Sequence, residues 1–407
     1  MSYRNGLDYL ESKTKVLELV DRFGARVAIC PDWNGRVMTS SSDGLDGTSY
    51  GLIHVTEIDA NPPHSSGFGG EDQFSLSPEG GPFSLDDVTS KPKCPAVRRH
   101  TPCGFQEGPF TVDMAPPAPQ IRMRRSLQMS NSAGTTFDFD VVRTIHLLNS
   151  KDVGDVFGEP VAVALEQADV SFVGFETINT LHNRGTPLNR KSGLVSIRIR
   201  SMFNSGQEMV AIVPFWTGED AERGPTIRAD FFGTSPHKRL RVLPQAALLR
   251  ADGKYRCQVG VSRKRVLPFL GAIDFRTGLM TLTTFTLPSE PWEYDYLGNE
   301  FCETTGNTGL DFVSIRGSRT SRQTEDSPYS GEVVRAYNHG PSAPGNVPTA
   351  RFYEFNVFSP AATLARGESL MHHQYTAHIN ADNQTLAYLA QTILGVDYEQ
   401  VYKKMIR

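Results

Sequence analysis

Apolar and polar residues alternate with period two through much of the chain after residue 135. This pattern is typical of β-strands with one buried face, because successive side chains of a strand point to opposite sides. Turn residues separate the alternating segments at short intervals, which favours an antiparallel sandwich over βαβ units. The segments are Thr136–Val141, Ala162–Leu165, Val170–Ile178, Leu194–Met202, Met209–Pro214, Arg239–Leu243, Tyr255–Val261, Leu279–Leu287, Val333–Tyr337, Phe352–Phe358 and Ser369–Ile379.

The first forty residues predict a short helix at Tyr9–Lys13 followed by a β-meander. Apolar residues between Val16 and Val20 suit the first strand. The dipeptide Asn34-Gly35 then separates two further strands, Arg26–Cys30 and Arg36–Ser40. Asn-Gly is a strong hairpin signal because both residues tolerate a positive φ.

Residues 41–120 differ from the rest of the chain. They are rich in Gly, Ser, Pro and Asp and poor in periodic apolar residues. We therefore expect a long loop insertion here, and loops of this length in a compact protein are often functional.

The C-terminus predicts helices. Asp382 suits the start of a first helix and Gly395 its end, and a second helix is expected at Tyr398–Met405. The apolar face of the first helix consists of Leu386, Leu389, Ala390, Ile393 and Leu394. Residues 1–380 should thus form a β-sandwich with the insertion at about 41–120, and residues 381–407 a helical appendage packed on it.

Charge and composition narrow the class of protein. The 407 residues carry a formal net charge of −4. No field of one sign is expected, so nucleic acid is disfavoured as a partner. No secretory signal or run of about 18 apolar residues is present, which disfavours a membrane partner. The five scattered cysteines favour free thiols and a cytoplasmic location, with a Cys94–Cys103 bridge left open.

Two Gly pairs enclose a group of acidic residues in the loop insertion. Glu71, Asp72 and Gln73 follow one pair, and Glu79 precedes the other. Glycine lets the backbone approach a ligand closely. Carboxylates accept hydrogen bonds from sugar hydroxyls or hold a cation. The alternative is a turn-rich surface loop with solvated acids.

Histidines are concentrated in the last predicted strand. Alternation places His372 and His378 on one face of it. A neutral imidazole can bind a metal or transfer protons near neutral pH. A metal site would need a carboxylate such as Glu354 or Glu71 nearby, as in a cupin-like metalloenzyme. The alternative is a polar outer strand face.

Glu354 lies between aromatic residues in Phe352–Phe358. An unpaired acid is costly to bury. Glu354 is therefore either solvated or paired in a pocket, with Arg36, Arg351 and the histidines as candidate partners.

The segment Phe68–Gly81, which reads FGGEDQFSLSPEGG, resembles the galactose mutarotase-like (aldose 1-epimerase-like) supersandwich proteins. The likeness is to an uncharacterised bacterial branch of that superfamily, and it covers nearly the whole chain. Each motif is short, and their shared order is the specific part. The other motifs are Gly35–Ser40, Asn179-Thr180, Gly193–Ile197, Phe231–Gly233, Ala251–Lys254, Gly331–Val334, Tyr337-Asn338, Phe352–Glu354, Gly367–Leu370 and Leu394–Val396.

The resemblance implies an all-β fold, a large two-sheet antiparallel supersandwich with short C-terminal helices. It implies a carbohydrate ligand and acid/base chemistry without a metal or cofactor, of the epimerase, lyase or hydrolase type. Glu354 would be the base and His372 or His378 the acid. The residues expected to bind substrate are Arg36, Glu71, Asp72, Gln73, Glu79 and Asn179.

The chain departs from the branch at four positions. Ser75 and Arg198 stand where the branch favours aromatic residues, and His339 and Asn356 where it favours acids. Aromatic rings contribute much of the affinity for sugars. A non-catalytic sugar-binding or scaffold protein on the same fold is therefore the main alternative. Exposed strand edges leave homo-oligomerisation open.

Overall fold

The computed structural model describes residues 1–60, 69–79, 83–85, 108–231, 239–297, 311–313, 319–320, 329–341 and 350–407. The proposed Cys94–Cys103 bridge and Cys302 lie outside these residues. So do Phe68, Gly80 and Gly81. Within them, Cys30 and Cys257 are buried free thiols.

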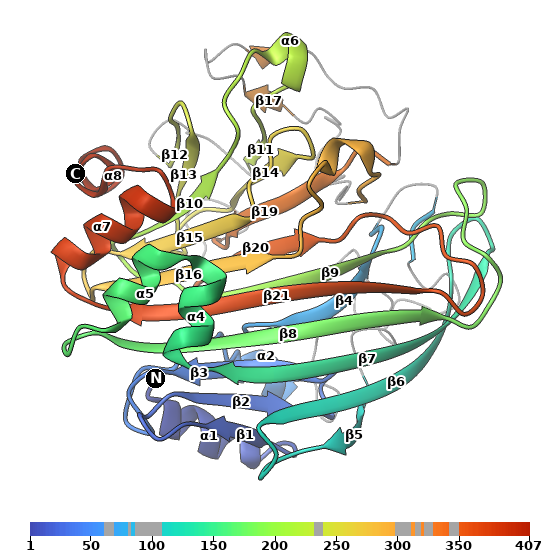
Figure 1. Ribbon diagram of the computed structural model, residues 1–407, viewed down its shortest axis with the longest axis horizontal. Helices are drawn as coiled ribbons and strands as arrows, with labels where there is room; N and C mark the ends of the chain where they lie inside the picture. The colour runs from blue at the N-terminus through green and yellow to red at the C-terminus, as the bar shows by residue number, and fades with distance from the viewer. Residues whose placement is uncertain are drawn as a thin grey trace.

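Two large sheets dominate the described part of the chain (Figure 1). Neighbouring strands within each sheet pair antiparallel. The ten-stranded sheet has the order β12 (Leu240–Val242), β13 (Ala246–Arg250), β10 (Met209–Pro214), β15 (Phe269–Asp274), β16 (Leu279–Phe285), β21 (Ser369–Asn380), β8 (Ser171–Asn183), β7 (Thr136–Leu148), β6 (Gln120–Ser130) and β5 (Thr111–Met114). The eight-stranded sheet has the order β18 (Arg319–Thr320), β17 (Asp311–Val313), β11 (Ile227–Phe231), β14 (Cys257–Ser262), β19 (Glu332–Asn338), β20 (Phe352–Phe358), β9 (Ser196–Asn204) and β4 (Gln73–Ser77).

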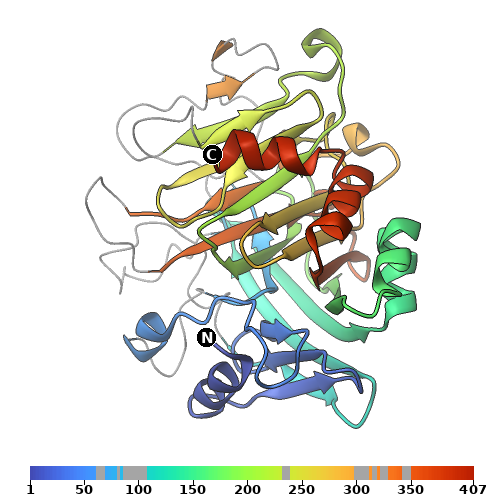
Figure 2. The ribbon, with the colours of Figure 1, turned by 90° about the vertical axis from the view of Figure 1, so that its left-hand side faces the viewer.

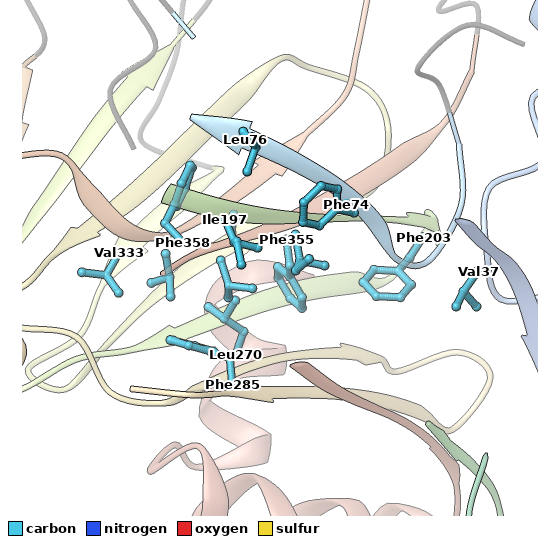
Figure 3. Close-up of a cluster of buried hydrophobic side chains, with 14 of the residues drawn as sticks. Val37, Phe74, Leu76, Ile197, Phe203, Leu270, Phe285, Val333, Phe355 and Phe358 are labelled. Atoms are coloured by element: carbon cyan, nitrogen blue, oxygen red, sulfur yellow. The ribbon is translucent and has the colours of Figure 1, made fainter. Parts of the chain in front are cut away.

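The main hydrophobic core fills the space between the two sheets (Figure 3). Strand alternation sends one set of side chains from each sheet into this layer. The eight-stranded sheet contributes Phe74, Ile197 and Phe355, and the ten-stranded sheet contributes Leu270 and Phe285. Burial of such aromatic and branched side chains is the main favourable term in folding.

Helices cover part of the outer face of the ten-stranded sheet (Figures 1 and 2). They are α4 (Ser150–Phe157), α5 (Glu159–Leu165), α7 (Asn383–Ile393) and α8 (Tyr398–Met405). Asp382 caps α7 by accepting a hydrogen bond from Thr385 N, and Gly395 follows the helix with φ +67°. Both predicted C-terminal helices are thus present and packed on the sandwich.

A small sheet lies at the N-terminal end, at the bottom of Figure 2. It consists of β1 (Leu17–Val20), β2 (Arg26–Cys30) and β3 (Arg36–Ser41), and helices α1 (Tyr3–Glu11) and α2 (Val55–Ala60) accompany it. The predicted hairpin is confirmed, because Asn34 and Gly35 both adopt positive φ between β2 and β3. The first helix begins six residues earlier than predicted because Ser2 caps it. Within the described residues, two further short helices are α6 (Asp220–Arg223) and η2 (Pro291–Glu293).

The predicted strand at Ala162–Leu165 is wrong, because these residues end helix α5. The buried residues are spaced by four on α4 (Val153 and Phe157) and by three on α5 (Val161 and Ala164), which is helical spacing. A four-residue alternation was too short to decide between helix and strand.

The segment expected to be a long loop insertion contains a helix and strands that its composition did not predict. Helix α2 and strands β4 and β5 all fall within residues 41–120. Strand β4 is buried along its whole length and pairs with β9, so it belongs to the sandwich. The predicted all-β fold of two antiparallel sheets with C-terminal helices is nevertheless confirmed. None of the helices in the described ranges has the length and apolar character needed to cross a membrane.

Candidate functional site

The outer face of the eight-stranded sheet, which points away from the ten-stranded sheet, carries a group of charged side chains. Ile197 on β9 and Phe355 on β20 point into the core between the sheets (Figure 3). Because side chains alternate along a strand, Arg198 and Arg200 on β9 and Glu354 on β20 point to the opposite side. Their own contacts, given below, agree with this placement.

Charged and amide side chains form a row across adjacent strands. Gln73, Arg200, Asn356 and Arg335 are direct cross-strand neighbours on β4, β9, β20 and β19. Such neighbours lie close enough for their side chains to interact. We refer to the following residues as the outer-face cluster: Gln73, Glu79, Arg198, Arg200, Arg228, Glu332, Arg335, Glu354 and Asn356.

Glu354 lies at the centre of this cluster. Its Oε1 atom is 3.1 Å from Arg200 Nε and accepts a hydrogen bond from Asn356 Nδ2 at 2.6 Å. Arg198 Nη2 lies 3.8 Å away. The Glu354 side chain is only 5% exposed. Of the two possibilities raised by the sequence, Glu354 is therefore the paired acid and not the solvated one.

Besides Glu354, Arg198 contacts two further members of the cluster and an aromatic ring. Its Nη1 atom lies 2.5 Å from Glu79 Oε2, and its Nε atom donates to Asn356 Oδ1 at 2.8 Å. The guanidinium carbon lies 5.5 Å from the centre of the Phe358 ring, a cation–π distance. The Arg198 side chain is 3% exposed, so these contacts fix it in one position.

A second carboxylate continues the cluster toward β11. Glu332 binds Arg228 at 2.8 Å and Arg335 at 2.9 Å. Burial opposes ionisation of Glu332, but the charges and hydrogen bonds of the two guanidinium groups outweigh it and hold its pKa below the usual range. Glu332 is therefore a charged member of the cluster near neutral pH.

His339 supplies an imidazole at the end of β19. Its Nδ1 atom lies 3.0 Å from the Tyr337 hydroxyl, and Tyr337 is the cross-strand neighbour of Glu354. Burial, followed by the positive charges of Arg256 and other groups including Arg200, lowers the pKa of His339 to about 4. The His339 imidazole is therefore neutral near pH 7, and the nearby positive charges contribute to its low pKa.

The four positions at which the chain departs from the mutarotase-like branch lie together here. Ser75 donates to the Arg198 carbonyl at 3.2 Å and is the cross-strand neighbour of Arg198. Arg198 binds Asn356 directly, and His339 is within electrostatic reach of Arg200. The four residues therefore lie on or beside the same face of the eight-stranded sheet.

A second polar group lies inside the sandwich, on the other side of the eight-stranded sheet. Glu71 accepts hydrogen bonds from the Ser40 backbone N at 2.5 Å and from the Ser40 hydroxyl, and its Oε2 atom lies 2.9 Å from His378 Nε2. His378 Nδ1 lies 2.9 Å from the Thr281 hydroxyl, and its ring stacks on Tyr50 at 4.4 Å. Glu71 and His378 are at most 1% exposed.

Asp72 connects the two sheets in this interior group. It binds Arg143 Nη2 at 2.6 Å and accepts hydrogen bonds from Thr177 at 2.7 Å and Gln374 at 3.3 Å. Gln374 also donates to the Ser201 hydroxyl on β9 at 2.9 Å. Asp72 and Arg143 are completely buried and bonded to each other, so this ion pair links the two sheets.

Comparison with known proteins places the chain in a family. Residues 1–307 and 317–405 match the model of a family of unknown function, DUF6786. The chain belongs to this family. No curated protein sequence matches it.

Several solved structures are similar to this DUF6786 chain. A proposed aldose 1-epimerase of Escherichia coli K12 is 8% identical, with a TM-score of 0.46 over 89% of this chain and 98% of the other. The Slr1438 protein of Synechocystis sp. PCC 6803 is 11% identical, with a TM-score of 0.48 over 91% and 97%. A proposed mutarotase of Salmonella typhimurium is 10% identical, with a TM-score of 0.41 over 92% and 100%.

The candidate residues from the sequence fall into two groups in the DUF6786 chain. Gln73, Glu79 and Glu354 lie at the outer-face cluster. The interior holds Glu71, Asp72, Asn179, His372 and His378. Glu354 and the two histidines thus lie on opposite sides of the eight-stranded sheet, and the structure does not bring the expected base and acid together.

Arg36 occupies neither group. It is fully buried below the turn that leads into β4, where its Nη1 atom donates to the Gly69 carbonyl at 3.2 Å. This placement suits support of the turn rather than contact with a ligand.

Sequence reasoning did not include Arg198, Arg200 and Arg335 among the candidate site residues. A signal was present, since Arg198 and Arg200 alternate with isoleucines in a predicted strand. Within the described residues, no three His, Cys, Asp or Glu side chains converge to hold a metal ion. The cupin-like alternative therefore lacks a site in that part of the chain.

Proposed function

We propose that this protein binds a carbohydrate at the outer-face cluster, with Glu354 as the carboxylate that contacts the ligand. The observation that carries the proposal is the position of Glu354 between Arg200 and Asn356. Carboxylate, amide and guanidinium groups fixed in one row can exchange hydrogen bonds with neighbouring hydroxyls of a sugar. The order of mutarotase-like motifs in the sequence supports a sugar as the ligand.

If the protein is an enzyme, Glu354 is the candidate base of an epimerase-like reaction. The base takes the proton of the anomeric hydroxyl, and an acid on the same side protonates the ring oxygen, which opens the ring without a cofactor. His339 lies beside Tyr337 on the same outer face, but its low pKa leaves it neutral near pH 7, so we do not assign it the role of that acid. His372 and His378 are separated from Glu354 by the sheet, so we no longer assign them the role of acid.

A non-catalytic sugar-binding protein is the second candidate. The contacts of Glu354 favour it, because Asn356 donates to the Glu354 Oε1 atom and Arg200 lies against it, which makes this oxygen less available as a base. The loss of acidic residues at His339 and Asn356 points the same way. A cytoplasmic location and self-association stay predictions.

Isothermal titration calorimetry tests the binding proposal. The probes are glucose, galactose and the uronates of both sugars. We expect one or more to bind the wild type, and Glu354→Gln to weaken that binding at least tenfold. The matched control is Glu176→Gln, which changes a carboxylate on the outer face of the ten-stranded sheet and should leave binding unchanged. Equal binding by Glu354→Gln and wild type would rule out this site.

NMR exchange spectroscopy between the anomers of a bound sugar separates the two candidates. Faster exchange with wild type than with Glu354→Gln supports the enzyme. Binding without faster exchange supports the non-catalytic protein.

The outer-face cluster has an excess of positive charge, with four arginines and three glutamates. We therefore expect the uronates to bind more tightly than the neutral sugars, and this difference in affinity to decrease as salt is added.

A further inference from the structure

The inner face of the ten-stranded sheet carries polar side chains that the interior ion pairs do not satisfy. Within the described residues, both ring nitrogens of His372 lack a hydrogen-bond partner, as do Asn179 Oδ1 and Gln374 Oε1. The same holds for Arg143 Nε and Nη1 and for the hydroxyls of Thr283 and Thr376. All of these side chains are at most 1% exposed.

These side chains are neighbours on the sheet. Arg143, Asn179 and His372 form a cross-strand row on β7, β8 and β21. Gln374 and Thr376 follow His372 on the same face of β21, and Thr376 is paired with Thr283 on β16. Successive members are thus separated by one strand spacing or two residues, a gap that one bridging molecule can span.

Leaving these atoms without partners would be costly. Each buried polar group without a hydrogen bond costs about 1–3 kcal/mol. Buried polar atoms in folded proteins are almost always satisfied by protein or by ordered water. A molecule that is part of the folded structure should therefore supply the partners.

The mixture of donors and acceptors identifies that molecule. Arg143 can only donate, whereas Asn179 Oδ1 and Gln374 Oε1 can only accept. The amide orientations are fixed, because Asn179 Nδ2 donates to the His372 carbonyl and Gln374 Nε2 donates to Asp72. An anion would be repelled by these amide oxygens and by Asp72, and a cation by Arg143. Water can both donate and accept.

We propose that a cluster of ordered water molecules is bound between the two sheets, along His372, Gln374 and Thr376 and across Asn179 to Arg143. The cluster lies behind the sheet that carries the outer-face cluster, and it is independent of any sugar binding there. It would join the side chains of β7, β8, β16 and β21 into one hydrogen-bonded layer.

Oxygen-17 relaxation dispersion of water tests the proposal on the wild-type protein. The method detects water molecules held for longer than the protein takes to tumble. We expect a clear dispersion from wild type and a smaller amplitude from Thr376→Val, which removes an interior hydroxyl. The control Thr180→Val removes a half-buried hydroxyl from the outer face of β8 and should keep the wild-type amplitude.

A crystal structure at high resolution identifies the bound species. Water-like density within hydrogen-bonding distance of His372 and Gln374 supports the proposal. Density for an ion, or wild-type protein without a long-lived water signal, would overturn it. Because the density beside His372 and Gln374 in the wild-type crystal decides the result, a variant that fails to fold does not affect the test.

Discussion

At the scale of single residues, His372 links burial to pH. Burial lowers its pKa from an ordinary value of 6.5 to about 3, so the native protein keeps this imidazole neutral. The unfolded chain binds a proton below pH 6.5 and the native protein does not. The contribution of His372 to stability is therefore constant above pH 6.5 and is lost progressively as the pH falls toward 3.

Urea unfolding at pH 7 and pH 5 measures this effect. We expect the stability of wild type to fall from pH 7 to pH 5 by about 2 kcal/mol more than that of His372→Gln. A proton that only the unfolded chain binds changes the free energy of unfolding by about 1.4 kcal/mol per pH unit. The control His182→Gln changes a half-buried histidine on the outer face of β8. A wild-type pH dependence that His372→Gln leaves unchanged would contradict the assignment.

The buried pair of Asp72 and Arg143 predicts a large cost of removing one partner. Arg143→Met leaves the Asp72 carboxylate buried without its counter-ion, and we expect a loss of about 3–5 kcal/mol in the free energy of unfolding. The double variant Asp72→Asn/Arg143→Met should recover part of this loss. Arg184→Met, which breaks the exposed pair with Asp140, should cost less than about 1 kcal/mol. Equal losses at the two arginines would show that the buried pair is not specially coupled.

At the scale of elements, the two glycines before β4 form the turn after which side chains point alternately into the interior and to the outer face of the eight-stranded sheet. Gly69 and Gly70 have φ of +92° and +94°. A Cβ atom on Gly70 would lie 2.5 Å from Arg36 Cδ and 2.8 Å from the Val37 carbonyl oxygen. Glycine is needed here for both its conformation and the close approach. After this turn, Asp72 enters the interior while Gln73 faces outward.

Gly70→Ala should therefore be more destabilising than an ordinary Gly→Ala change at positive φ. The control is Gly134→Ala, at φ +82° with nothing within 4 Å of the added Cβ, which isolates the backbone strain of about 1 kcal/mol. We expect Gly70→Ala to lose at least about 1 kcal/mol more than Gly134→Ala in chemical denaturation. Similar losses would mean that Arg36 moves aside at little cost.

Element prediction from the sequence succeeded where the periodicity was long or the turn chemistry strong. Met209–Pro214, Phe352–Phe358 and Tyr398–Met405 match β10, β20 and α8 at both ends. It failed at β4, because five buried residues between glycines and prolines look like loop until their partner β9 is known. Pairing between distant segments is a tertiary property that local composition does not contain.

At the scale of the whole molecule, the candidate site could also be predicted only in part, because its arrangement depends on tertiary packing. Alternation correctly placed His372 and His378 on one face of a strand, but it left open whether Glu354 is solvated or paired, which only its contacts decide. Which side of a sheet faces the core depends on what packs against it, and one sheet stands between Glu354 and both histidines. The sequence alone could not decide this, since both faces of β20 carry large buried side chains.

The separation of the two groups predicts that the same Glu→Gln change affects sugar binding at one group and not at the other. Glu354→Gln alters the outer-face cluster, so we expect at least a tenfold loss of sugar binding by the protein that remains folded. Glu71→Gln weakens the bonds to Ser40 and His378 in the interior, so we expect a loss of about 2–4 kcal/mol in stability. The Glu71→Gln protein that remains folded should bind as wild type does.

Calorimetric binding and urea unfolding of both variants measure the two effects. A Glu71→Gln protein that is folded but does not bind would place the interior group in the site, against the arrangement described here. The comparison is well matched, because both changes are Glu→Gln and both side chains are almost fully buried. Burial alone therefore cannot produce a difference in binding, which we attribute to the side of the eight-stranded sheet that each carboxylate occupies.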